Sequence, residues 1–266
     1  MASTTTTVEL PDGESTVLER WGSAGPLLLC VHGIASSRKS WARTADALAK
    51  SYRVAAYDQR GHGDFAKIWG PMTLQQSVAD CVAVADSLEE PIAGIIGHSW
   101  GGTVALLAGP KIQTTKVVAI DPMIHQAPGN NWYADFVHEL EPLMAEPPER
   151  REAAIRKTFA GLPPIEIDAK VHALKNMSLK PLFRLGEQNG ADFGRWDIRT
   201  ELRRYPLDLL LLLADPAESV VLADDMWIIE ETLGPKGRIV AFEGEGHTLH
   251  RTAFERYIET ITGFLA

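Results

Sequence analysis

A glycine-flanked serine is the clearest chemical signal in the sequence. The segment Gly97-His98-Ser99-Trp100-Gly101 matches the pattern G-x-S-x-G, directly after the apolar run 92–96 and before a helical stretch near Gly102. A strand that turns sharply into a helix strains its central serine and presents the hydroxyl above the sheet. Because a serine is a weak nucleophile without a base to take its proton, the pattern predicts Ser99 as a nucleophile with a base elsewhere in the chain.

His247 is the expected base. It ends the segment Gly244-Glu245-Gly246-His247, between the last predicted strand and the last predicted helix. A histidine on that loop can reach back over the sheet to Ser99, which its role as a base requires. The competing histidines fit this role less well. His98 is expected to point away from the serine, His62 belongs to a polar loop after a strand, and His250 is expected in solvent.

Acyl transfer also needs donors for the negative charge that develops on the carbonyl oxygen. One expected donor is the backbone N–H of Trp100, which follows the nucleophile. The other is the backbone N–H of Ile34 in His32-Gly33-Ile34, directly after the apolar run 27–31. These two amides form the predicted oxyanion hole, and His32 is expected to organise the loop by hydrogen bonding.

Short apolar runs alternate with longer helical stretches along most of the chain. We expect strands at 17–21, 27–31, 52–57, 92–96, 117–120, 209–213 and 238–242, and helices at 41–48, 74–88, 102–107, 226–233 and 254–264. Continuous apolar strands separated by helices are typical of a parallel sheet covered on both faces. The predicted fold class is therefore α/β, with a mostly parallel, doubly wound sheet.

Residues 123–204 break this rhythm. The segment is rich in proline and charge, and its helix-like pieces have no clear strand between them. We interpret it as a helical cap inserted between two core strands, with the core formed by residues 1–122 and 205–266. Such a cap either simply covers one end of the sheet or also shapes a substrate pocket, because function in these folds lies in the connections at the carboxyl ends of the strands.

Four motifs in order resemble the α/β-hydrolase superfamily, in particular its capped esterase, lactonase and C–C hydrolase branches. They are His32-Gly33, Asp58-Gln59-Arg60-Gly61-His62-Gly63, Gly97-His98-Ser99-Trp100-Gly101-Gly102 and Gly246-His247. The resemblance covers nearly the whole chain except the cap. It implies an α/β-hydrolase fold with an inserted cap and a serine nucleophile served by histidine and an acid.

The acid is the open position. In the superfamily it usually follows the strand after the cap, in a Gly-x-x-Asp turn, and the segment 213–221 has no such turn. Glu218 stands before two apolar residues there, as the family acid often does, and Asp215 directly ends the strand. In some relatives the acid follows a different strand, the one after the helix that begins at the nucleophile turn. In this chain Asp121 stands at that position. Asp121 and Glu218 both remain candidates, with Asp215 as a third.

Composition narrows the function classes. The chain has 266 residues, 45% of them hydrophobic, and a formal net charge of −9, which argues against a nucleic-acid partner. The sequence contains no H-E-x-x-H, Cys/His cluster, G-x-G-x-x-G or P-loop, so we expect neither a metal nor a nucleotide cofactor. It shows no secretory signal and no apolar stretch long enough for a membrane span.

The two cysteines, Cys30 and Cys81, are expected to be buried thiols in a reducing cytosol. The cysteines therefore predict a cytoplasmic protein. Together with the charge and hydropathy above, we expect a monomer or homodimer that acts on a small molecule and contacts neither nucleic acid nor membrane.

The expected reaction is hydrolysis of a small or medium carboxylic ester or lactone through an acyl-enzyme on Ser99. Aromatic residues beside the serine and in the cap favour an apolar pocket, although they could equally pack the cap against the core; they are Trp100, Trp132, Tyr133, Phe136, Phe183, Phe193 and Trp196. The alternatives are a C–C bond hydrolase, a cofactor-free haloperoxidase-like enzyme and a small-molecule receptor. A serine nucleophile argues against an epoxide hydrolase or haloalkane dehalogenase, since those enzymes use a carboxylate.

Overall fold

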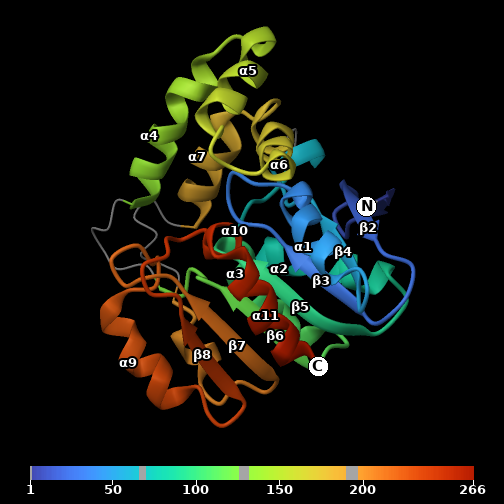
Figure 1. The fold of residues 1–266 in the computed structure, drawn as a ribbon, viewed down its shortest axis with the longest axis vertical. Helices are drawn as coiled ribbons and strands as arrows, with labels where there is room; N and C mark the ends of the chain where they lie inside the picture. Colours follow the sequence, from blue (N-terminus) through green and yellow to red (C-terminus); the bar gives the residue numbers. More distant parts are fainter. Residues whose placement is uncertain (1, 66–69, 126–131, 190–196) are drawn as a thin grey trace.

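The computed structural model describes residues 2–65, 70–125, 132–189 and 197–266. Within them the strands form one sheet in the order β1-β2-β4-β3-β5-β6-β7-β8 (Figure 1). Their bounds are β1 Ser3–Glu9, β2 Ser15–Trp21, β3 Leu27–Val31, β4 Arg53–Tyr57, β5 Ile92–His98, β6 Lys116–Ile120, β7 Asp208–Leu213 and β8 Gly237–Ala241. Strands β1 and β2 run antiparallel to their neighbours, and the pairs from β4 to β8 are parallel. The predicted α/β class with a mostly parallel sheet is confirmed.

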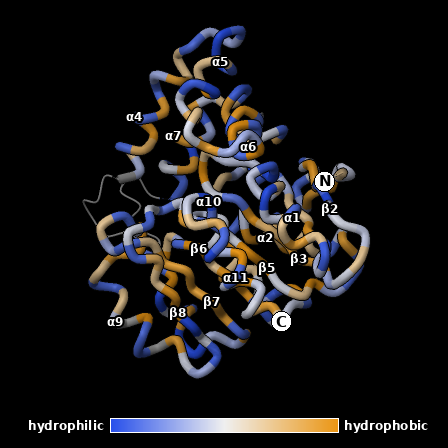
Figure 2. The backbone as a smooth tube through the Cα atoms, in the orientation of Figure 1, coloured by the Kyte–Doolittle hydropathy of each residue, from blue (hydrophilic) through white to orange (hydrophobic). Residues whose placement is uncertain are grey.

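Each central strand buries both of its faces. Along β3, Leu27 and Leu29 belong to the hydrophobic core under one face, whereas Leu28 and Cys30 belong to the core under the other. This alternation follows from the two-residue period of a strand. Figure 2 shows the result as hydrophobic tube segments along the middle of the sheet. Continuous apolar runs in the sequence therefore correspond to strands with helices on both sides.

The helices of the core lie on two sides of the sheet. Helices α2 (Leu74–Ser87), α3 (Trp100–Ala108) and α9 (Ala223–Thr232) contribute to one core, and α1 (Ala42–Leu48) and α11 (Phe254–Leu265) to the other. The remaining short elements are the 3-10 helices η1 (Arg38–Trp41), η2 (Gly63–Phe65) and η3 (Gly109–Lys111) and the one-turn helix α10 (Leu249–Thr252).

Between β6 and β7 the described residues form helices without an intervening strand. They are α4 (Trp132–Ala145), α5 (Pro148–Thr158), α6 (Pro164–Leu174), α7 (Leu179–Gln188) and α8 (Arg199–Leu202). In Figure 1, α4 to α7 stand together above one end of the sheet. They fall within the segment 123–204 that the sequence predicts as a cap. An isolated bridge between His125 and Asp197 joins the two ends of this segment.

Strand β1 and the start of helix α3 differ from the sequence-based expectation. Strand β1 was not predicted, because its threonine-rich residues are almost all exposed and show no apolar alternation. It is an edge strand that pairs only with β2 among the described strands. Helix α3 starts at Trp100 rather than near Gly102, since the turn at Ser99 leads directly into the helix.

Two further expectations concern cysteine and membranes. Cys30 and Cys81 are free and buried, and burial raises the pKa of both thiols, that of Cys81 to about 12. Among the helices in the described ranges, none has the length and apolar character needed to cross a bilayer.

The central strands are expected to carry the stability of the fold. Leu211 in β7 is fully buried between β6 and β8. Replacing Leu211 with Ala should lower the free energy of unfolding by about 2–5 kcal/mol, because it removes buried methyl groups and leaves a cavity. The measurement is urea unfolding followed by circular dichroism. The Thr5→Ala variant, on exposed β1, is the control and should change stability by less than about 0.5 kcal/mol. Equal unfolding midpoints for the two variants would contradict this assignment of the core.

Candidate active site

Ser99 occupies a strained turn between β5 and α3. Its φ is 54° and its ψ is −123°, a backbone conformation that residues other than glycine rarely adopt. Its N–H donates to the carbonyl oxygen of Ile120 at 2.9 Å, which ties the turn to the end of β6. A Cβ atom on Gly97 would lie 2.1 Å from the Gly101 oxygen, and one on Gly101 would lie 2.2 Å from the Val31 oxygen. Both glycines are therefore required for the turn to exist.

His247 meets Asp121. The Nδ1 atom of His247 lies 2.6 Å from Oδ2 of Asp121, and since a carboxylate accepts, Nδ1 carries the donated proton. The Nε2 atom is then the ring nitrogen that can accept a proton. His247 is half-buried, Asp121 is fully buried, and His247 and Ser99 line the same cavity.

Four donors converge on the buried carboxylate of Asp121. Besides His247, the N–H of Ala214 donates to Oδ1 at 3.1 Å, the hydroxyl of Ser219 to Oδ1 at 2.5 Å, and the N–H of Val220 to Oδ2 at 3.1 Å. Such donors are what a carboxylate needs to be buried without a counter-ion. Asp121 itself has a φ of 41°, which aspartate tolerates better than most residues. The carboxylate is thereby fixed in place before it meets His247.

The other two acid candidates lie elsewhere. The side chain of Glu218 is exposed, and no histidine of the described residues pairs with it. Asp215 accepts the N–H of Gly244 at 2.9 Å and that of Ala217 at 3.1 Å, and these backbone donors lower its pKa. Asp215 therefore holds the loop that carries His247 but does not touch the imidazole. The structure brings only Asp121 of the three candidates to His247.

The loop after β3 lies against Ser99. A Cβ atom on Gly33 would lie 3.1 Å from Cβ of Ser99, so this backbone passes very close to the elbow. Ile34 lines the cavity, and Ala35 after it has a φ of 53°. Trp100 is the first residue of α3, where the helix dipole favours negative charge. Its side chain is buried in the core and does not line the cavity, contrary to the aromatic role expected for it.

His32 organises this loop, as the sequence suggested. Its Nε2 accepts the N–H of Gln59 at 2.9 Å, and its Nδ1 donates to the carbonyl of Gly33 at 2.8 Å. Burial lowers the pKa of His32 to about 4, so the ring stays neutral near pH 7. The two bonds fix its tautomer and the path of the chain into Ile34.

His98 supports the loop of His247, a role that the sequence did not reveal. Its Nε2 donates to the carbonyl oxygen of His247 at 2.9 Å, and the two rings are 4.7 Å apart. On its other side the ring centre of His250 lies at 4.3 Å. The expectation that His250 is solvated is wrong, because α10 turns it inward against Trp41. Burial lowers the pKa of both His98 and His250 well below the ordinary value.

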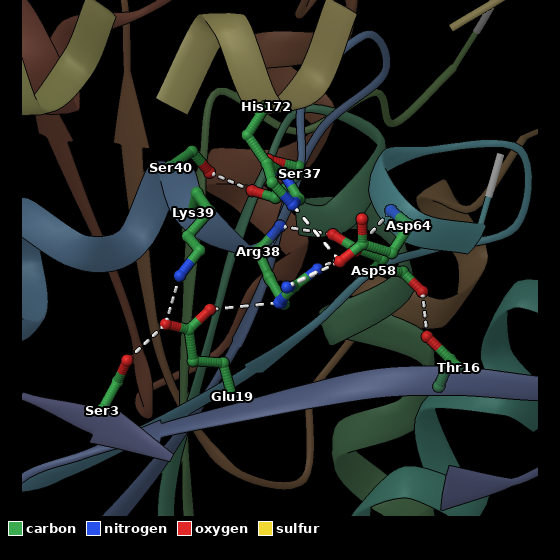
Figure 3. A network of polar contacts seen from close by, with 10 residues as sticks. All are labelled: Ser3, Thr16, Glu19, Ser37, Arg38, Lys39, Ser40, Asp58, Asp64 and His172. Atoms are coloured by element: carbon green, nitrogen blue, oxygen red, sulfur yellow. Dashed lines mark hydrogen bonds and ion pairs between the residues drawn. The ribbon is translucent and has the colours of Figure 1, made fainter. Parts of the chain in front are cut away.

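A polar network joins the loop after β3 to helix α6 (Figure 3). Arg38 in η1 pairs with Glu19, Asp58 and Asp64, and His172 on α6 lies 2.9 Å from the Ser37 hydroxyl. Among the described residues, Asp58, Asp64 and His172 form the one cluster with metal-ligand spacing. The Arg38 guanidinium already donates to both carboxylates, so this cluster is an ion-pair network and does not fit a metal ion.

A cavity of about 680 Å³ opens above Ser99, between the core loops and the helices α4 to α6. The wall formed by these helices is largely apolar and includes Phe136, Leu140, Leu143, Phe159 and Leu174. Of the predicted pocket aromatics, Phe136 lines it, whereas Phe183 is exposed and Tyr133 is buried with its hydroxyl on the Leu182 carbonyl. Phe193, Trp196 and the side chain of Trp132 lie outside the described residues.

Comparison with known proteins shows the family of this chain. Residues 28–260 match the model of the alpha/beta hydrolase family. The chain belongs to the α/β-hydrolase family. Its fold also resembles the solved structure of E-2-(acetamidomethylene)succinate hydrolase, with a TM-score of 0.78, 20% identity and 99% of each chain covered.

Two curated relatives match shorter stretches. Epoxide hydrolase B of Mycobacterium tuberculosis is 40% identical over 84 residues, which make up 30% of this chain and 24% of that protein. A bifunctional esterase/perhydrolase of Acinetobacter calcoaceticus is 32% identical over 97 residues, 36% of this chain and 35% of that protein. The match to this chain therefore covers only about a third or less of the length of each of these two relatives.

The buried histidines predict a loss of stability in acid. Burial lowers the pKa of His32 to about 4 and that of His62 to about 3, and those of His98 and His250 lie well below 6.5. The unfolded chain therefore binds protons first. The free energy of unfolding should fall from pH 6.5 downward, with a slope approaching about 1.4 kcal/mol per pH unit for each histidine. Urea unfolding at pH 7, 6 and 5 measures it.

The His62→Gln variant should reduce the slope of the free energy of unfolding against pH, because one buried histidine no longer contributes to it. His138→Gln, at an exposed site on α4, is the matched control and should leave the slope unchanged. A free energy of unfolding that stays constant between pH 7 and pH 5 would show that these rings are not held neutral.

Proposed function

We propose that this protein is a serine hydrolase that cleaves a small or medium carboxylic ester or lactone through an acyl-enzyme on Ser99. The observation that carries the proposal is the hydrogen bond between His247 and Asp121. His247 also lines the same cavity as the strained Ser99. An acid that orients the ring leaves the other ring nitrogen to serve as the base. These are the three roles that nucleophilic acyl transfer requires.

The proposed reaction has two halves. In the first, Nε2 of His247 takes the Ser99 proton as the oxygen attacks the carbonyl carbon, and the same proton then passes to the leaving alcohol. In the second, His247 removes a proton from water as the water oxygen attacks the acyl carbon. The bond between the acyl carbon and the Ser99 oxygen then breaks, the acid product leaves, and His247 returns the proton to the Ser99 oxygen. The Asp121 carboxylate holds the ring in the required tautomer and stabilises its positive form.

The negative charge on the carbonyl oxygen needs its own partners. The proposed partners are the backbone N–H groups of Ile34 and Trp100. Ile34 lines the cavity on the loop that lies against Ser99, and Trp100 begins α3. Donors of this type typically contribute about 3 kcal/mol each to the transition state. A loop held by His32 and Gly33 supports this assignment because donors act best when they are already oriented.

Size and lining support a small-molecule substrate. The cavity of about 680 Å³ lies within the usual range for small-molecule sites, and its cap side is mainly apolar. The match to an esterase/perhydrolase favours one second candidate, a cofactor-free perhydrolase or haloperoxidase-like reaction at the same serine. The matches to epoxide hydrolases do not favour that activity here, since a serine stands at the elbow.

Active-site labelling tests the nucleophile. A fluorophosphonate probe should add to wild-type protein once per chain, as read by intact mass, because it reacts with an activated serine. The Ser99→Ala variant should not be labelled. Folded wild-type protein that takes up no probe would contradict the proposal, and it would favour a receptor that binds without turnover.

Three acid variants extend this test to the assignment of the triad. With a p-nitrophenyl ester of short chain length, Asp121→Asn should lower kcat by roughly three to four orders of magnitude. Glu218→Gln is the exposed control and should stay within a fewfold of wild type. Asp215→Asn should have a modest effect through the Gly244 loop. A large loss in Glu218→Gln with near-normal Asp121→Asn would overturn the assignment.

A further inference from the structure

We propose that the substrate carries a carboxylate near the bond that is cleaved, and that Arg251 and Lys170 bind this carboxylate. The inference rests on the proposed function, because it names the substrate class of that same site. Both side chains line the cavity that holds Ser99 and His247. A purely apolar ester would offer neither side chain an acceptor.

Arg251 is buried but poorly paired. It lies on α10, four residues after the proposed base, and its side chain is only 5% exposed. Its Nη2 reaches the Ser36 hydroxyl at a long 3.5 Å, and its Nε is 3.4 Å from Oε2 of Glu166 without forming a hydrogen bond. A guanidinium has five N–H donors. Most of those donors have no acceptor among the described residues, which is costly for a buried charge.

Lys170 on α6 is a second basic side chain on the cavity wall. Its Nζ atom lies 4.9 Å from the ring centre of Phe159, which lines the same cavity. No carboxylate of the described residues forms an ion pair with it. Burial, together with the nearby charge of Arg251, lowers the pKa of Lys170 to about 7. A bound carboxylate would accept hydrogen bonds from Arg251 and would favour the protonated form of Lys170.

The basic side chains and the acidic ones lie in different parts of the cavity. Arg251 and Lys170 face one buried carboxylate, that of Glu166. The other acidic residues of the cavity, Glu139 and Glu146, come from α4 and the turn after it, and Glu139 is exposed to water. A carboxylate is the group that a planar guanidinium binds with two parallel hydrogen bonds.

The position of Arg251 limits the length of the substrate. It contacts Ser36, two residues beyond Ile34, whose N–H is a proposed oxyanion donor. Two residues span at most roughly 7 Å of chain, so Arg251 contacts the same short loop that carries the proposed oxyanion donor. We therefore expect the carboxylate and the reacting carbonyl to lie at the two ends of a short substrate. A half-ester of a short dicarboxylic acid has this arrangement.

The Arg251–Glu166 contact also links α10 to the cap, so a purely structural role has to be separated from recognition. Ethyl hydrogen glutarate and its neutral amide analogue, ethyl 5-amino-5-oxopentanoate, have nearly the same shape and the same ester. Ethanol release gives kcat/KM for each. The ratio of the two values reports recognition of the charge, whereas a loss of stability or of triad geometry lowers both values together.

For wild-type protein we expect the acid to be favoured roughly ten- to a hundredfold, the range for hydrogen bonds to a charged group. Lys170→Met should reduce this ratio, and the double variant Glu166→Gln/Arg251→Gln should bring it close to one. The double variant avoids leaving Glu166 buried without its partner. Lys180→Met, at an exposed lysine on α7, is the matched control and should keep the wild-type ratio.

Two outcomes overturn the inference. One is a wild-type ratio of the two kcat/KM values near one, because the wild-type protein alone then shows no preference for the charged substrate. The other is a preference for the acid that persists in both the Lys170→Met and the double variant. Fluorophosphonate labelling of Ser99 in the same samples separates the failures. If Ser99 is labelled but the acid is not preferred, only the proposed recognition of a carboxylate is contradicted. If neither labelling nor ester hydrolysis is seen, the proposed function is contradicted as well.

Discussion

The hydrogen bond between His247 and Asp121 is the interaction on which the rest of the site depends. It joins the loop after β8 to the end of β6, two points far apart in the sequence. Three neighbours hold its two ends. Asp215 binds the backbone of the histidine loop, His98 binds the carbonyl of His247, and Ser219 binds the carboxylate. The imidazole is thus oriented over the cavity before any substrate arrives.

Backbone strain is concentrated at the carboxyl ends of three neighbouring strands. Ala35, Ser99 and Asp121 follow β3, β5 and β6, and each has a positive φ. Conformations of this kind cost about 1–3 kcal/mol each and persist only where the surroundings enforce them. Here the surroundings are parallel strands buried on both faces and glycines that allow close backbone contacts. The rigid sheet therefore stabilises the geometry that the proposed chemistry requires.

The sequence predicted what local patterns can encode. The buried strands show as apolar runs, and the turn at Ser99 shows in its flanking glycines. The partner of His247 could not be predicted from the sequence. Asp121 follows β6 and Glu218 follows β7, and only the path of the chain after β7 decides which of the two carboxylates reaches the histidine. Burial of His250 depends likewise on how α10 packs on Trp41. Strand β1 was missed since an exposed edge strand needs no apolar pattern. Long-range packing decided each of these positions.

A proton NMR spectrum of protein with ¹⁵N-labelled histidine tests the central interaction most directly. The proton that His247 shares with Asp121 should give a strongly downfield signal coupled to Nδ1, because a short bond to a carboxylate deshields it. The signal should be present in wild type, Glu218→Gln and Asp215→Asn and absent in Asp121→Asn and His247→Gln. A downfield signal that survives in Asp121→Asn, or disappears in Glu218→Gln, would contradict the account.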